Sequence, residues 1–514
     1  MLKVASKKAA RAMRWVPKSR PGWVLACFFA LLVVGLVTGT IVLAIRWPFT
    51  QANITHELED LSASKVEIRS FRATYFPRPG CVAQGIIFRH GQDVSGQPFI
   101  ALSSMRIESG IPGLFNKHLA RVTANGVHVT VPHGMQESFL GAKTSKIVVQ
   151  ELIADDSVLE FSSGNSAKKP FSFYIQRFRL HNVGRQTVTS FDVALANPLP
   201  RGDVTARGHL GPWQENRVQT AISGAYQFTN ADLGVFGGIK GKLNSKGTFS
   251  GTLGAIEAAG NIDVPDFQVS SSPNHTALKS EFTAVVNTRN GNVDLKKVLA
   301  RARQTTLLAS GRIAAQAGKG RSAELSLSCM NGRIEDLLRL FTKSSRGPMS
   351  GAVNFSAHAK IPPGKDPFLK KLQLAGDFGI SDSEFNKPDT QQSVDRLSAG
   401  ARGEKEPEKS GLVLSDLKGR AVLQQGVARL SDLTFGVPGA LAQMRGTYNV
   451  ISQQVNLHGD LTTRKSIANT TSGVKSAFLR VLSPFFKKKH REKAPVKVTG
   501  TYSHPSFGLD IGGG

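Results

Sequence analysis

The chain has 514 residues, with 65 Lys and Arg against 37 Asp and Glu, and a formal net charge of +28. Hydrophobic residues make up 40% of it and glycines number 51, so the composition excludes a chain that is disordered along its whole length. Three cysteines, Cys27, Cys81 and Cys329, exclude a disulfide-built scaffold and a cysteine-rich zinc module. The length favours about three domain-sized units, and one elongated unit is also allowed.

The positive charge is concentrated near the two ends of the sequence. Residues 1–22 have seven cations and no acid, and residues 464–497 have ten cations and one acid, Glu492. A layout of this kind favours anionic membrane surfaces over nucleic acid as the partner of the basic segments. The sequence also has no aromatic RNA-recognition motif and no helix-turn-helix, so we expect no nucleic-acid partner.

An uncharged apolar run extends from Trp23 to Ile45. As a helix that rises about 1.5 Å per residue, it would reach about 34 Å, which is enough to cross a bilayer core. Trp23 and Trp47 flank the run, where interfacial aromatic residues are expected. The basic segment 1–22 before it predicts a cytoplasmic N-terminus and a single-pass anchor. The alternative is a cleaved signal peptide ending near Ala44, although the apolar core of such peptides has only about 7–15 residues.

The first element expected after the anchor is a helix over residues 50–62, because Ile54, Leu58 and Leu61 recur at helical spacing. A period of two then replaces the helical period, and this alternation of polar and apolar residues is typical of strands. Early strands are predicted at residues 65–71, 126–131, 157–161 and 171–175.

From about residue 200 the sequence predicts a long series of short strands, in which a glycine repeatedly stands two residues before an apolar residue. The glycines of this unit are Gly208, Gly224, Gly247, Gly260, Gly311, Gly351, Gly376, Gly446 and Gly500. Their irregular spacing excludes a fixed-period solenoid such as a leucine-rich repeat. The fold class predicted is therefore mainly β: a transmembrane helix followed by an elongated antiparallel sheet with a few short helices.

Strict alternation gives such a sheet one apolar face and one polar face. Protein covers the apolar face in a closed barrel or sandwich, whereas a curved open sheet can hold lipid chains. The 29 Phe against 5 Tyr and 4 Trp favour the lipid groove, because Phe needs no hydrogen-bond partner; an ordinary Phe-rich core is the alternative. Strand parity selects six candidates for the groove face: Phe249, Ile262, Phe267, Val353, Phe355 and Phe378.

Three further segments interrupt or follow the strands. Residues 332–342 predict a short amphipathic helix, and the polar, charged residues 386–410 predict a disordered loop, or else a regulatory or partner-binding segment. Residues 472–489 have an apolar helical stripe followed by basic residues, which favours docking on a membrane surface; a cap on the open end of the sheet is the alternative. The docking candidates are Phe478, Leu482, Phe485, Lys487, Lys488, Lys489 and Arg491.

No catalytic pattern is found in the sequence. A G-x-S-x-G elbow and an H-E-x-x-H pair are both absent, and residues 237–243 fail the phosphate-loop pattern. His128 and His133 are the nearest histidine pair, and they do not predict a metal site. Cys81 and Cys329 are expected to be single buried thiols unless the fold brings them together. We therefore expect no enzyme activity, no catalytic or metal-binding residue and no cofactor.

With these residues in view, the chain resembles the AsmA-type family of periplasmic proteins anchored in the inner membrane. The resemblance covers the anchor and the segment 47–90 at one end, then 433–461, 475–489 and 495–511 at the other. Individual words such as HPSFGLD are weak signals, and the order of the segments is what is specific. These parts make up about a quarter of the chain, and between them only the strand rhythm is similar.

The resemblance implies a repeated β-groove, similar to bridge-like lipid-transfer proteins that move phospholipid acyl chains between inner and outer membranes. About 25 strands at about 4.8 Å would give a groove of about 120 Å. The implied regions are a basic tail 1–22, the inner-membrane helix 23–45, an N-terminal region 46–205, a groove body 206–461 and a C-terminal segment 462–514. The alternative function is a scaffold that assembles outer-membrane proteins through its sheet edges.

Overall fold

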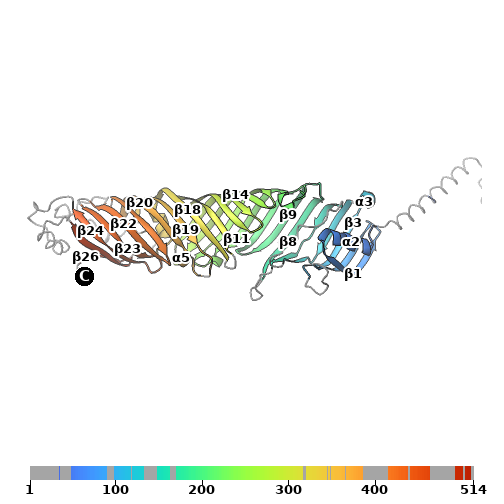
Figure 1. Cartoon of the computed structure of the whole chain (residues 1–514), viewed down its shortest axis with the longest axis horizontal. Helices are drawn as coiled ribbons and strands as arrows, with labels where there is room; N and C mark the ends of the chain where they lie inside the picture. Colours follow the sequence, from blue (N-terminus) through green and yellow to red (C-terminus); the bar gives the residue numbers. More distant parts are fainter. Residues whose placement is uncertain are drawn as a thin grey trace, which may run out of the picture.

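The computed structural model of the chain describes one long sheet with a few short helices (Figure 1). The described residues are 34, 48–89, 98–116, 118–131, 147–161, 170–316, 320–343, 345, 347, 349–364, 366–385, 415–437, 440–463, 493–501 and 504–510. Four predicted segments lie outside this set: the basic tail 1–22, the anchor 23–45 apart from Val34, the loop 386–410, and the docking helix 472–489 with Arg491. Within the described part, no helix is long and apolar enough to span a membrane.

The strands in the N-terminal part are β1 (Lys65–Thr74), β2 (Gly80–Arg89), β3 (Ile100–Ser109), β4 (His118–Asn125), β5 (His128–Val131), β6 (Val148–Ile153), β7 (Ser157–Phe161), β8 (Phe171–Val183), β9 (Thr189–Pro198) and β10 (Arg201–Leu210). The next are β11 (Ala221–Asp232), β12 (Ile239–Lys240), β13 (Lys242–Thr252), β14 (Ala255–Val269), β15 (His275–Asn287), β16 (Asn292–Ala302), β17 (Thr305–Gln316) and β18 (Gly320–Arg333). The last are β19 (Met349–Ile361), β20 (Gln373–Phe385), β21 (Ser415–Gln424), β22 (Val427–Val437), β23 (Ala440–Asn449), β24 (Gln454–Thr463), β25 (Lys493–Thr501) and β26 (His504–Leu509).

The helices are α2 (Gln51–Ser62), α3 (Ile111–Asn116), α4 (Ile334–Arg339) and α5 (Phe368–Lys371), with 3-10 turns η2 (Arg217–Gln219) and η3 (Leu233–Phe236). The predicted early helix and strands are thus confirmed, and the helix expected over 332–342 is present as the shorter α4. Figure 1 shows the sheet extending from β1 and α2 at one end to β24 and β26 at the other.

Most strands pair antiparallel with the strand before them in the chain, as the alternation and short turns predicted. The expectation of a wholly antiparallel sheet is wrong at two pairings, because β4 pairs parallel with β6 and β5 pairs parallel with β7. The alternation of side chains is the same in both kinds of pairing, so it does not distinguish them. The distinguishing feature is the connection 132–146, since parallel neighbours need a crossover of about a dozen residues or more.

Helix α2 covers the apolar face at the β1 end of the sheet. Thr50 begins the helix by accepting a hydrogen bond from the backbone N of Asn53 at 3.3 Å, and Ala63 ends it in the left-handed conformation. Ile54 of α2 is buried in a cluster with side chains from β1, β2 and β3. This cluster contains Phe49, Ile54, Val66, Cys81, Ala83, Ile86, Phe88, Phe99, Met105 and Ile107. The β1 end is therefore an ordinary closed core.

Candidate apolar groove

The register places three of the six predicted groove residues on one face at β13 and β14. Phe249 pairs with Ala258, which lies an even number of positions before Ile262 in β14. Ile262 and Phe267 are an odd number of positions apart, so a regular strand would point them to opposite faces. A bulge between Val264 and Phe267 restores the face, because Phe267 then pairs with Thr276 of β15.

The same face continues to the other three predicted residues. Across β15–β18 the paired residues stay on one side of the sheet, up to Cys329 of β18, which pairs with Phe355 of β19. Phe355 pairs in turn with Phe378 of β20, and Val353 lies two positions before Phe355. One continuous apolar face therefore contains all six residues, and whether they bind lipid stays a prediction.

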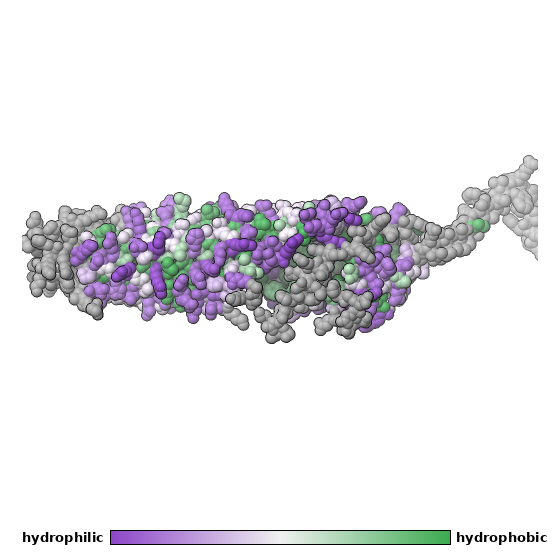
Figure 2. Space-filling view, in the orientation of Figure 1, coloured by the Kyte–Doolittle hydropathy of each residue, from purple (hydrophilic) through white to green (hydrophobic). Residues whose placement is uncertain are grey.

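The two faces of the sheet differ in exposure and in charge. Five of the six residues are half-buried, while Val353 is buried at 2% exposure under α4. Ion pairs lie on the opposite face, for example Lys360 with Glu324 at 2.8 Å, where the Lys360 ammonium lowers the pKa of the Glu324 carboxyl. Figure 2 shows hydrophilic residues over much of the visible side of the body, with hydrophobic residues between them. Among the described residues, protein therefore covers the apolar face incompletely at these five positions.

Aromatic rings lie next to glycines on the apolar face. Phe191 of β9 pairs with Gly208, Gly208 with Gly224, and Gly224 with Phe249 of β13. Although two strands separate them, the rings of Phe191 and Phe249 stack at 6.3 Å between centroids and 22° between planes. A Cβ built on Gly208 would lie 2.9 Å from the Phe191 ring, and one on Gly224 would lie 2.8 Å from the Phe249 ring. The recurrent glycines thus make room for rings along the groove floor.

Two hydrogen bonds connect turns that lie at opposite ends of the strands. Turns separated by an odd number of antiparallel strands lie at opposite strand ends. The five strands β19–β23 separate the α4 connection from the β23–β24 turn, so these two segments belong to opposite rows of turns. Gln453 of that turn nevertheless donates from Nε2 to the backbone O of Phe341 at 3.1 Å. Similarly, the backbone N of Phe368 in α5 donates to Gly237 O at 3.0 Å, across β13–β19. The sheet therefore curls enough to bring its two rows of turns into contact, and these contacts cross the opening between the rows, which we call the mouth of the groove.

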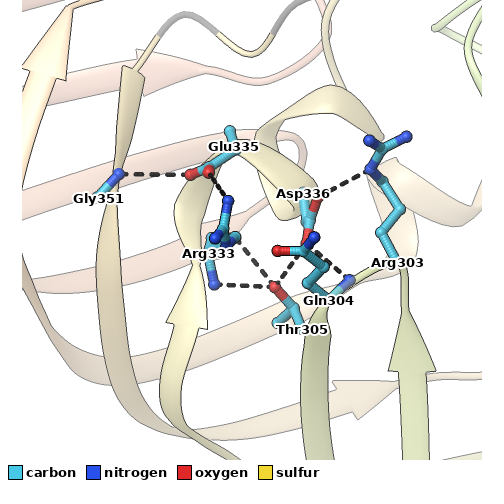
Figure 3. A network of polar contacts seen from close by, with 7 residues as sticks. All are labelled: Arg303, Gln304, Thr305, Arg333, Glu335, Asp336 and Gly351. Atoms are coloured by element: carbon cyan, nitrogen blue, oxygen red, sulfur yellow. Dashed lines mark hydrogen bonds and ion pairs between the residues drawn. The ribbon is translucent and has the colours of Figure 1, made fainter.

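Helix α4 is held at its first turn by a buried carboxylate. Asp336, at 4% exposure, accepts hydrogen bonds from Arg303 Nε at 2.9 Å, Gln304 N at 3.0 Å and Thr305 Oγ1 at 3.1 Å (Figure 3). Glu335 points to the other side of the turn, toward Arg333 and Gly351. The Asp336 contacts attach α4 to the β16–β17 turn, so that Ile334 and Leu337 pack over the apolar face.

The other end of α4 is attached to the β14–β15 turn. Asn274 Nδ2 donates to the backbone O of Arg339 at 3.1 Å and of Thr342 at 2.9 Å. Ser272 Oγ donates to Thr342 O at 2.6 Å and lies 3.3 Å from Arg339 O. These side chains satisfy carbonyl groups that a helix leaves unpaired at its C-terminus.

A separate pocket of about 500 Å³ lies among β18–β21. Eight of its twelve lining residues belong to the polar face, including Glu324, Ser326, His358 and Lys360. Ser326 Oγ lies 3.2 Å from His358 Nδ1, and Lys360 pairs with Glu324. This pocket is a hollow on the charged side of the sheet and is not part of the apolar groove.

Cys81 and Cys329 are both free and buried, as the sequence predicted. They lie in different clusters, one at the β1 end and one beneath α4. Burial raises the pKa of the Cys81 thiol to about 12 and also raises that of Cys329.

His128 pairs with Glu160 at 3.3 Å, while His133 lies outside the described residues. Among the described residues, no group of His, Cys, Asp and Glu is arranged to hold a metal ion.

Sequence reasoning missed the residues that shape the mouth and floor of the groove. Phe191 lies in β9 and Gln453 in the β23–β24 turn, and no sequence pattern marks either residue. Their partners, Phe249 and Phe341, lie far away in the sequence. The glycine repeat was the available signal for the ring positions, since each glycine lies on the same face as the apolar residue two positions later.

Comparison with known proteins gave no match to any family model, to any curated protein or to any solved structure. The resemblance to the AsmA-type family therefore stays a prediction that depends on the quoted sequence segments.

Proposed function

We propose that this protein binds the acyl chains of phospholipids along its apolar face and supports phospholipid transport between the inner and outer membranes. The observation that supports this most is the apolar face that α2 covers at the β1 end and that is half-buried at Phe249, Ile262, Phe267, Phe355 and Phe378 in the body. We propose the inner and outer membranes as the two membranes because the chain resembles the AsmA-type family. Residues 23–45 would anchor the chain in the inner membrane, with 1–22 cytoplasmic and the body periplasmic.

The chemistry of the face suits acyl chains. Each methylene removed from water contributes about 0.8 kcal/mol, so even a partly covered chain is held by several kcal/mol. Phenylalanine rings and glycines offer a surface without polar groups that would need partners. A chain lying on this face keeps its polar headgroup toward the mouth, where water and charged residues are available.

Among the described residues of the body, we find no element that would drive the movement of lipid. We propose that lipid flows along the face down its concentration gradient, or with energy supplied by a partner. The basic residues Lys487, Lys488, Lys489 and Arg491, with Phe478, Leu482 and Phe485, would dock the far end on an anionic membrane surface; these residues lie outside the described part.

Native mass spectrometry of the detergent-extracted full chain tests the proposal. We expect several phospholipids to stay bound per chain, and we expect Phe355→Asp to lose them because it puts a charge on the groove face. Ser356→Asp is the matched control, since Ser356 is exposed on the polar face of the same strand. Equal lipid numbers in both variants, with circular dichroism showing that both are folded, would contradict the groove assignment.

A scaffold for outer-membrane proteins is the second candidate. Among the described strands, β1 and β26 each pair on one side only, so both present an open edge that can accept a strand from a partner. A wild-type chain that retains no phospholipid in the same experiment would favour this function.

A further inference from the structure

Arg339 at the end of α4 is an exception among the arginines of the described part. Four of these arginines are not exposed: Arg89, Arg177, Arg217 and Arg339. Arg89 pairs with Glu67 at 3.3 Å, Arg177 pairs with Asp192 at 3.0 Å, and Arg217 stacks over Trp213 at 5.6 Å. Arg339 has no ion pair within the described residues, and its Nε is buried without a hydrogen-bond partner.

Two more unpartnered polar atoms belong to the β14–β15 turn and the start of β15, the segment that is hydrogen-bonded to the end of α4. Buried side-chain atoms that lack a partner in the described part are Arg339 Nε, Ser271 Oγ and Thr276 Oγ1. Ser271 is adjacent to Ser272, whose hydroxyl lies 3.3 Å from the backbone O of Arg339. Thr276 is two residues beyond Asn274, whose amide donates to the same oxygen at 3.1 Å. All three belong to the junction between α4 and the β14–β15 turn.

Arg339 is the last residue of α4, and its backbone O accepts a hydrogen bond from Asn274 of the β14–β15 turn. Residues three apart in a helix lie on the same side, so Arg339 follows Asp336, which binds the neighbouring β16–β17 turn. Thr276 belongs to the groove face, because it pairs with Phe267, and it is 4% exposed. The junction therefore places a cation and two hydroxyls next to the apolar face, at the edge where a lipid headgroup would lie.

Each of the three groups can donate a hydrogen bond to an oxyanion. Buried polar groups in folded proteins have partners, and an isolated unpartnered set commonly marks a missing water or ion. A guanidinium with neighbouring hydroxyls matches a phosphate, which offers several acceptor oxygens and a negative charge. A neutral ligand would leave the guanidinium charge unpaired.

We propose that Arg339, Thr276 and Ser271 form a phosphate-binding site that holds the headgroup phosphate of a lipid whose acyl chains lie on the groove face. This proposal rests on the proposed function, because it requires a lipid whose acyl chains are bound on the groove face. The chemistry recognised is a phosphate, so free inorganic phosphate is the other possible source, and the experiment separates the two.

Calorimetric titration of the full chain in detergent would use three probes: dihexanoyl phosphatidic acid, dihexanoylglycerol and inorganic phosphate. We expect Arg339→Gln to weaken phosphatidic acid binding at least tenfold and to leave dihexanoylglycerol binding unchanged. Thr276→Val, which keeps the shape of the side chain, is expected to weaken it about threefold. Lys343→Gln is the matched control, because Lys343 is exposed on the same segment and the charge change is the same.

The ¹⁵Nε signal of Arg339 in the wild-type chain gives a readout that does not depend on a variant folding. We expect it to shift with phosphatidic acid and not with dihexanoylglycerol. A shift of equal size at equal concentration of inorganic phosphate supports the site and assigns it to free phosphate. No shift with either phosphate, or a wild-type affinity in Arg339→Gln, overturns the site while the groove stands. Failure of both lipids to bind the wild type contradicts the proposed function as well.

Discussion

The β1 end of the sheet and its body have the same alternating strands but different cores. At the β1 end, Ile86, Cys81 and Ala83 are at 0% exposure, because α2 and the segment around Phe99 cover the apolar face. In the body the equivalent face is half-buried at Phe249 and Ile262, whereas Val353, against which the short helix α4 packs, is buried. Alternation thus determines which side chains share a face, whereas a separate amphipathic element determines whether protein covers that face.

The largest difference is expected between two isoleucines on the two parts of this face. Ile86→Ala leaves a cavity in the closed core and should lower the free energy of unfolding by about 2–5 kcal/mol. Ile262→Ala should cost under about 2 kcal/mol, because the side chain is already half in contact with solvent or ligand. Hydrogen exchange of the β1–β3 and β13–β15 amides measures both. Equal costs would contradict the distinction between a closed and an open part.

Removing the carboxylate that attaches α4 should loosen this helix over the apolar face of the body without affecting the β1 end. Asp336→Ala leaves Gln304 N and Arg303 Nε without their acceptor, while the Thr305 hydroxyl keeps Arg333 O as its acceptor at 3.1 Å; the loss should cost about 1–3 kcal/mol. Faster hydrogen exchange should appear in residues 334–343 and not in β1–β3. The control is Asp294→Ala, whose pair with Arg312 at 3.4 Å is exposed and contributes about 0–1 kcal/mol. Unchanged exchange at 334–343 in Asp336→Ala would show that other contacts hold the helix.

The groove floor can be tested by adding one methyl group. A Cβ on Gly224 would meet Arg207 O at 2.4 Å and the Phe249 ring at 2.8 Å, so Gly224→Ala should cost about 1–3 kcal/mol and displace the ring. At Gly379 on the polar face the nearest atom would be Lys418 Cγ at 3.9 Å, and Gly379→Ala should be neutral or slightly stabilising. Thermal unfolding followed by circular dichroism compares the two. A neutral Gly224→Ala would mean that the stacked rings do not depend on the glycines.

The smallest effect at neutral pH concerns the thiol in the closed core. Burial raises the pKa of Cys81 to about 12, whereas an unfolded thiol ionises near about 8.5. The folded state is therefore favoured fully below about pH 8.5, and this contribution falls as pH rises toward 12. We expect Cys81 to resist alkylation by N-ethylmaleimide at pH 8 until the β1 end unfolds. Alkylation at the rate of a free thiol would contradict the closed core.

The sequence predicted α2 and many of the strands, because these depend on local periodicity, whereas Phe267 shares the face of Ile262 only because of the bulge between Val264 and Phe267. It did not predict the parallel pairings of β4 with β6 and β5 with β7, because side chains alternate in the same way in parallel and antiparallel pairs. It also did not reveal the bond from Gln453 to Phe341 or the stacking of Phe191 on Phe249. These contacts join residues that only the curl of the whole sheet brings together.

The central claim is that lipid occupies one face of the body and not the other. Photo-crosslinking residues placed in cells at Phe249 and Phe355, and at their polar-face neighbours Thr248 and Ser356, test it most directly. We predict that phospholipid is captured at positions 249 and 355 and not at 248 and 356. Capture at the polar-face positions alone, or equally at all four, would contradict the account.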